Sequence, residues 1–275
     1  MLYPVPLKVT DTKLSFFGGL EVIKVGSKIT LAQVGQTAII TLPAIVAGRS
    51  LGIDGLGMFR AIFDLASRVW FISNGFGLVI FPVFAKMRIR FPLTSSNIFR
   101  SVSSTSSVFY LMLLSLGILL SPQLIKFIHL DSQSLPLMTL IIIGMLMNAH
   151  SNTMYEMIQS IRQPILLAIV SLVACLPYLI VWQAQNYTPE AAGMIWIISQ
   201  TVYLILMDVI YIYALGRSII FIRKLLDTIL FVSISLAFWF FRDNWFSYLV
   251  FAFSLVKFLN GMIKMRANWS NEAIV

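Results

Sequence analysis

Long hydrophobic stretches separated by short polar segments run through most of the chain. A helix that crosses a bilayer needs about 20 consecutive, mostly apolar residues, and eight stretches have this character. The predicted spans are residues 26–47, 57–85, 105–128, 134–158, 164–184, 191–215, 219–240 and 244–262. The pattern therefore predicts an all-α integral membrane protein with about eight transmembrane helices.

The predicted helices form one transmembrane lobe over residues 26–262. Residues 1–25 precede it and are expected to form a cytoplasmic amphipathic approach or linker segment along the membrane interface. Residues 263–275 follow it as a predicted cytoplasmic tail. The sequence thus predicts a single membrane domain with short flanking segments.

Composition agrees with a membrane protein. Charged residues make up 11% of the chain, against about 25% in a typical soluble domain. The net charge of +9 would favour nucleic-acid binding in a soluble chain, but the basic residues lie between the hydrophobic stretches. We therefore expect the lipid bilayer, and no nucleic acid, as a partner.

The basic residues also predict the orientation of the helices. Cytoplasmic loops carry an excess of Lys and Arg, and such residues alternate from loop to loop here, with Lys86, Arg88 and Arg90 in one loop and none in the loop near 185–189. This alternation predicts that both termini lie in the cytoplasm.

The second predicted span contains several polar residues: Arg60, Asp64, Arg68 and Asn74. Each charge at the centre of a membrane helix costs about 2.5–3.5 kcal/mol on insertion scales, so the three charges indicate a polar cavity or a protein partner. Their spacing of four predicts that Asp64 can pair with either arginine. Two simpler interpretations stay open: a structural pair of Asp64 and Arg68, and an Arg60 side chain that reaches the interface.

The first predicted span adds Lys28, Gln33, Gln36 and Thr37. Gln33, Gln36 and Thr37 are expected to share one face. Lys28 is a candidate binding residue, but it also lies close enough to the interface to extend its side chain there.

Polar groups recur in the fourth and sixth spans. Asn148, Asn152, Tyr155, Glu156 and Gln159 are expected to line one face, and Asp208 lies in the middle of its span. Glu156 is a candidate ion-coupling residue or a solvated one near the cytoplasmic end. His150 is expected to pack inside the protein, because no second histidine or cysteine stands at the spacing of metal ligands. The spans at 105–128, 164–184 and 244–262 are nearly free of such groups.

The motifs of several enzyme classes are missing. The chain has no GxxxxGK[ST], no GxSxG and no HExxH, and its basic loops lack the acidic clusters that would hold a metal. We expect no enzyme, no cofactor and no metal site. A basic cytoplasmic rim with a polar interior instead suits transport of an anionic amphiphile.

Residues 22–90 resemble the seventh and eighth helices of Wzx-type polysaccharide flippases, of the superfamily that includes multidrug exporters. The resemblance rests on VIKVGSKITLAQVGQ, on AGRSLGIDGLGMFRAIFDLASRV and on VIFPVFAKM, which ends in the cytoplasm. The acidic residue that the family often carries before the turn glycine is replaced here by Pro43 and Ala44.

The resemblance implies one lobe, the C-terminal one, of a two-lobe transporter in the bacterial inner membrane. It implies translocation of undecaprenyl-diphosphate-linked oligosaccharide in O-antigen or polysaccharide biosynthesis, by alternating access. Candidate substrate-binding residues are Lys28, Gln33, Gln36, Arg60, Arg68 and Asn74, and candidate ion-coupling residues are Asp64, Asp208 and Glu156. Expected partners are a second lobe, as an N-terminal half or a second copy, and glycan assembly machinery.

Two other functions are compatible with the residues. One is a drug or metabolite exporter of the same superfamily, against which the surplus of arginine over acid in the first two spans argues. The other is a non-transporting fragment or assembly partner, which the length of a single lobe favours.

Overall fold

The computed structural model describes residues 16–75, 78, 92–159, 164–182, 188–215, 218–240 and 244–272. This part of the chain is almost entirely helical and contains no β-strand, which confirms the predicted all-α class. The helices are α1 (Phe16–Ala66), α3 (Pro92–Phe127), α4 (Leu135–Gln159), α5 (Pro164–Ala174), α6 (Leu176–Val181), α7 (Pro189–Leu215), α8 (Ser218–Phe240) and α9 (Asn244–Glu272), with a 3₁₀ turn η1 (Ser132–Ser134) before α4.

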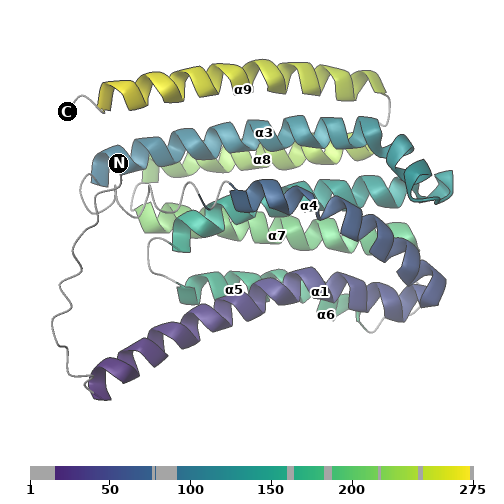
Figure 1. Ribbon diagram of the computed structural model, residues 1–275, viewed down its shortest axis with the longest axis horizontal. Helices are drawn as coiled ribbons and strands as arrows, with labels where there is room; N and C mark the ends of the chain where they lie inside the picture. Colours follow the sequence, from purple (N-terminus) through teal and green to yellow (C-terminus); the bar gives the residue numbers. More distant parts are fainter. Residues whose placement is uncertain are drawn as a thin grey trace, which may run out of the picture.

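Helix α1 reverses its direction at Gly52. The backbone there has φ 70° and ψ −172°, a combination that is essentially restricted to glycine. Figure 1 shows the chain turning back on itself within α1. We call residues 16–51 the first limb and residues 53–75 the second limb. The reversal lies between the first two predicted spans.

Five helices in the described ranges are long and apolar enough to cross a membrane. They are Gly26–Gly75, which includes the second limb and most of the first, Ser104–Phe127, Ser132–Tyr155, Pro189–Ile210 and Trp245–Ile263. Two further apolar helices, Ile165–Leu179 and Asp227–Phe240, are shorter. These helices are compatible with a multi-pass membrane protein, but they do not confirm the count of eight spans, which stays a prediction.

Helix α4 forms the centre of the lobe. It packs against α7, α3 and α1, and nearly every side chain from Leu137 to Ser151 is buried. Gly144 allows α7 to approach closely, because a Cβ at this position would collide with the indole of Trp196. The same indole Nε1 donates a hydrogen bond of 3.3 Å to the carbonyl of Ile141. Small residues at helix contacts are typical of membrane bundles.

The remaining helices cover this centre in layers (Figure 1). The first limb packs along α5, where a Cβ on Gly35 would lie 2.8 Å from the Cβ of Ser171. On the other side α9 packs along α3. The start of α1 and the end of α9 lie at the same end of the molecule in Figure 1, while the cytoplasmic location of the termini stays a prediction.

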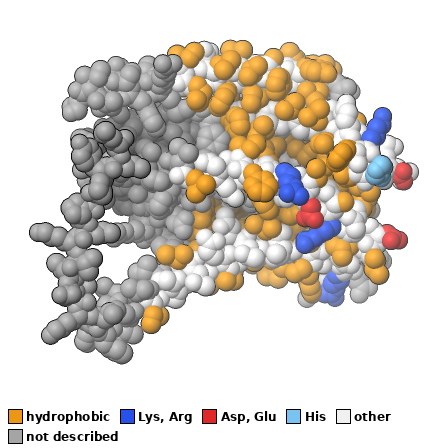
Figure 2. Space-filling view, in the orientation of Figure 1, with side chains coloured by type: hydrophobic (Ala, Val, Ile, Leu, Met, Phe, Trp, Pro, Cys, Tyr) orange, Lys and Arg blue, Asp and Glu red, His pale blue; other side chains and the backbone are white. Residues whose placement is uncertain are grey.

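The surface is rich in large hydrophobic side chains. Ile53 is 89% exposed, Leu78 79% and Phe240 76%. Figure 2 shows few charged side chains on the visible face, surrounded by hydrophobic ones. Extended apolar surface of this kind marks a contact with lipid or protein, in agreement with the expected bilayer.

Candidate functional site

A chain of side-chain amides connects three helices in the middle of the lobe. Gln36 Nε2 on the first limb donates to Asn152 Oδ1 on α4 over 3.0 Å. Asn152 Nδ2 donates to Asn148 Oδ1 over 3.1 Å, and Asn148 Nδ2 donates to Oε1 of Gln200 on α7 over 2.7 Å. Gln36 and the two asparagines were predicted as polar groups of two different spans, and the structure brings them together.

The amide chain becomes more buried from α1 to α7. Gln36 and Asn152 are half-buried, whereas Asn148 is 1% and Gln200 0% exposed. Gln200 Nε2 has no hydrogen-bond partner. A buried donor without a partner costs about 1–3 kcal/mol. The unpaired Nε2 of Gln200 therefore lowers the stability that the network contributes to the fold.

His150 lies on the other side of α4 from this amide chain. Its ring is fully buried, with Nε2 3.1 Å from Oγ of Ser107. The rings of Tyr110 and Phe231 lie 5.7 and 5.1 Å away. The histidine is thus held by aromatic packing and a hydroxyl. In the described ranges no group of three or more His, Cys, Asp or Glu side chains could hold a metal ion.

Asp208, a candidate ion-coupling residue, is fully buried on α7. Thr228 Oγ1 on α8 donates a hydrogen bond to its Oδ2. This bond joins α7 to α8 inside the protein. The ion-coupling role of Asp208 stays a prediction.

The charged residues of the second limb have the opposite environment. Arg60, Asp64, Arg68 and Asn74 are all exposed. No ion pair joins Asp64 to either arginine, which makes the predicted pairing wrong. For Arg68 the reason is local: the helix ends at Ala66, and Ser67 and Arg68 form a turn in which Trp70 N donates to Ser67 O over 2.9 Å. Residue spacing of four therefore does not place Arg68 above Asp64.

The first limb also presents polar side chains to the outside. Gln33 and Thr37 are exposed, whereas Gln36 points into the lobe and Lys28 is half-buried. The expectation that Gln33, Gln36 and Thr37 share one face is therefore wrong for Gln36. We call Thr30, Gln33, Thr37 and Thr41 the first polar stripe, and Arg60, Asp64, Arg68 and Asn74 the second polar stripe.

The fourth predicted span contributes further candidate residues at its C-terminal end. The side chains of Glu156 and Gln159 lie outside the described residues, although both belong to α4. Tyr155, expected on the same face, is buried at 2% exposure. The proposed role of Glu156 stays a prediction.

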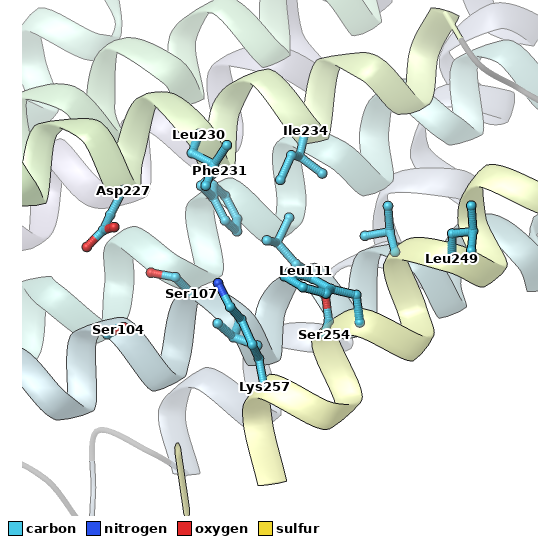
Figure 3. A pocket seen from close by; sticks show the side chains of 13 residues that line it. Ser104, Ser107, Leu111, Asp227, Leu230, Phe231, Ile234, Leu249, Ser254 and Lys257 are labelled. Atoms are coloured by element: carbon cyan, nitrogen blue, oxygen red, sulfur yellow. The ribbon is translucent and has the colours of Figure 1, made fainter. Parts of the chain in front are cut away.

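A polar group between α8 and α9 was not predicted from the sequence. Asp227, Ser254 and Lys257 line a pocket there together with residues of α3 (Figure 3). Lys257 lies inside the 244–262 span that was expected to be nearly free of polar groups. A charged residue within an apolar stretch was the available signal, but its place in the same pocket as Asp227 depends on how the helices pack.

Comparisons with protein-family models, with curated proteins and with solved structures give no match to this chain.

Proposed function

We propose that the chain is one lobe of a transporter that moves undecaprenyl-diphosphate-linked oligosaccharide across the bacterial inner membrane, in O-antigen or related polysaccharide biosynthesis. The observation that carries this proposal is the exposure of Arg60, Asp64 and Arg68 on a helix within a long apolar segment. The resemblance of residues 22–90 to Wzx-type flippases gives the substrate class.

The second polar stripe is incompatible with contact to lipid chains. Each of its three charges would cost about 2.5–3.5 kcal/mol at the membrane centre, and no ion pair between Asp64 and the arginines lowers this cost. In the proposal the stripe faces a water-filled cavity between two lobes. The first polar stripe supplies hydroxyl and amide groups to the same cavity, where they hydrogen-bond sugar hydroxyls.

Arg60 and Arg68 are the proposed binding residues for the diphosphate. A guanidinium group donates two parallel hydrogen bonds to a phosphate, and both side chains are exposed and free of an acidic partner. Lys28 and Asn74 extend the polar surface. The carboxylate of Asp64 partly offsets the positive charge of the two arginines, so that the substrate is bound weakly enough to be released.

Asp208 and the amide chain are the groups proposed to couple protonation to a change at the cavity wall. Protonation of a buried carboxyl group changes the hydrogen bond with Thr228, and hence the contact between α7 and α8. Gln200 lies on the same helix as Asp208 and is joined to the first limb through Asn148, Asn152 and Gln36. A change at α7 can therefore reach the cavity wall.

The test is complementation in a bacterial strain that lacks its own O-antigen flippase. The chain is expressed alone and with a candidate N-terminal lobe, and surface glycan is measured at equal protein level in the membrane. We expect the paired variant Arg60→Gln with Arg68→Gln to reduce surface glycan at least about tenfold, which corresponds to about 1.4 kcal/mol of lost interaction.

Arg49→Gln is the matched control. Arg49 is exposed and lies 4.7 Å from the ring of Trp182 at the end of the first limb, outside both stripes. We expect it to keep normal glycan levels, and we expect Lys at positions 60 and 68 to restore part of the activity. Full activity of the Arg60→Gln, Arg68→Gln variant would overturn the anion-binding role. Export of cationic drugs without any glycan rescue would favour a drug exporter instead.

A further inference from the structure

A groove opens between α8 and α9 with α3 as its floor. Its volume is about 300 Å³. Its apolar walls include Leu111 of α3, Ile234 of α8 and Leu249 of α9. It lies away from both polar stripes, which belong to α1 and its continuation. The groove is therefore a separate site from the proposed transport cavity.

The groove has one polar end and one apolar end. Figure 3 shows Asp227, Ser104, Ser107 and Lys257 gathered at one end, while Ile234 and Leu249 extend toward the other. Asp227 and Ile234 are seven residues apart on α8, which corresponds to about 10 Å along a helix. A ligand that fits this layout has a polar head and a hydrocarbon chain.

The two charges at the polar end have opposite sign and do not neutralise each other. Asp227 and Lys257 are both exposed, and no ion pair joins them. The Lys257 ammonium instead lies 4.9 Å from the ring centre of Phe253. Two opposite charges held apart at one end of a groove match a head group that carries an anion and a cation.

A third polar group lies deeper in the groove. Ser254 is 1% exposed, lines the groove and has no hydrogen-bond partner for its hydroxyl group. Buried hydroxyl groups normally have a partner. An oxygen atom of a ligand in the groove would supply the missing acceptor.

We propose that this groove binds a membrane phospholipid with a phosphoethanolamine head group. Lys257 contacts the phosphate, Asp227 accepts hydrogen bonds from the primary ammonium, and the Ser254 hydroxyl donates to an ester oxygen. The acyl chain lies along Leu111, Ile234 and Leu249. The proposal requires only that the chain lies in a membrane, and it is independent of the proposed transport activity.

The charges distinguish this lipid from the common alternatives. A purely anionic head group would attract Lys257 but would be repelled by Asp227. A choline head group carries a cation without N–H donors, so it cannot hydrogen-bond the carboxylate. The ethanolamine head group alone satisfies both residues, which makes selectivity among the three lipids the quantity to measure.

The experiment is native mass spectrometry of the full chain purified in detergent. The probes are phosphatidylethanolamine, phosphatidylcholine and phosphatidylglycerol with identical acyl chains, added in equal amounts. We expect retention of phosphatidylethanolamine at least about fivefold above the other two, on the order of 1 kcal/mol of selectivity. Asp227→Asn should remove this preference, whereas Lys257→Gln and Ser254→Ala, which lose contacts to the phosphate and to an ester oxygen, should lower the retention of all three lipids.

Matched control variants test whether the lipid binds in this groove. Lys126 of α3 and Asp54 of the second limb are exposed and lie outside the groove, so Lys126→Gln and Asp54→Asn should keep the preference. Ile234→Trp should block the groove, whereas Ile229→Trp, at an exposed position of the same helix outside the groove, should not. Thermal unfolding of each variant identifies those that fail to fold.

Three results would overturn the proposal. They are equal retention of phosphatidylglycerol, an unchanged preference in a folded Asp227→Asn variant, and unchanged lipid retention in a folded Lys257→Gln variant. None of these results bears on glycan rescue, so failure of this proposal and failure of the transport proposal are separately detectable.

Discussion

Asn148 on α4 donates a 2.7 Å hydrogen bond to Gln200 on α7, and both side chains are buried in the middle of the lobe. This bond joins α7 to the central helix α4 at the deep end of the amide chain. It is also the shortest of the three bonds in that chain. The contact between the two helices therefore combines apolar packing with a buried polar link.

Replacing both partners of this bond should cost less than the two single replacements added together. Asn148→Leu and Gln200→Leu each leave a buried polar group unpaired, and each should destabilise the protein by about 1–3 kcal/mol. The double variant should be more stable than the sum predicts, by about 0.6 kcal/mol and at most about 1.7 kcal/mol. Unfolding of the four proteins in mixed detergent micelles measures this coupling, and strict additivity would contradict it.

Gly52 should be sensitive to any side chain. A Cβ there has no heavy atom within 4 Å, so the effect of Gly52→Ala comes from the backbone conformation alone. We expect a loss of about 1–3 kcal/mol. Gly57→Ala is the control, because Gly57 also has open space around it but has no positive φ; this variant should be neutral or up to about 1 kcal/mol more stable. Equal effects in thermal unfolding would refute the role of Gly52.

Gly35→Ala should loosen the contact between the first limb and α5. The added methyl group would lie 2.8 Å from the Cβ of Ser171, and overpacking typically costs about 1–3 kcal/mol. Gly26→Ala in the same limb meets no atom within 4 Å. Unfolding in micelles should therefore show a lower stability for Gly35→Ala than for Gly26→Ala. An unchanged stability of the Gly35→Ala protein would show that the first limb does not pack against α5.

The second polar stripe should be accessible to water in the membrane. Asp64→Cys should react with a hydrophilic maleimide, whereas Val256→Cys, on the exposed apolar surface of α9, should remain unmodified because it faces lipid. The natural Cys175 is buried and serves as the internal background. Labelling of position 256 but not 64 would reverse the assignment of the two surfaces.

Hydrophobic pattern predicted the positions of the helices well because length and apolarity are local properties of the sequence. The reversal between the first two helices falls at Gly52, within the gap that the pattern left between them. The pairing of Asp64 with Arg68 was wrong because the spacing argument assumed an unbroken helix, and Ser67 and Arg68 form a turn. Helix continuity is decided by packing as well as by spacing.

The groove between α8 and α9 could not be predicted from spacing. Asp227 and Lys257 lie on different helices, and their common end of the groove arises only when both helices pack near α3. The inward direction of Gln36 has a similar origin. Its neighbour Asn152 is 116 residues away, so only the assembled lobe determines which of the polar residues of the first limb turns inward.

The exposed charges of the second polar stripe also bear on the life of the protein in the cell. A lobe that exposes Arg60, Asp64 and Arg68 without ion pairs between them needs a partner to cover these charges. Each such charge costs about 2.5–3.5 kcal/mol at the membrane centre, and we expect the unaccompanied chain to be less stable in the membrane than the assembled one. The amount of the chain in the membrane would then depend on the synthesis of the partner that covers the second polar stripe.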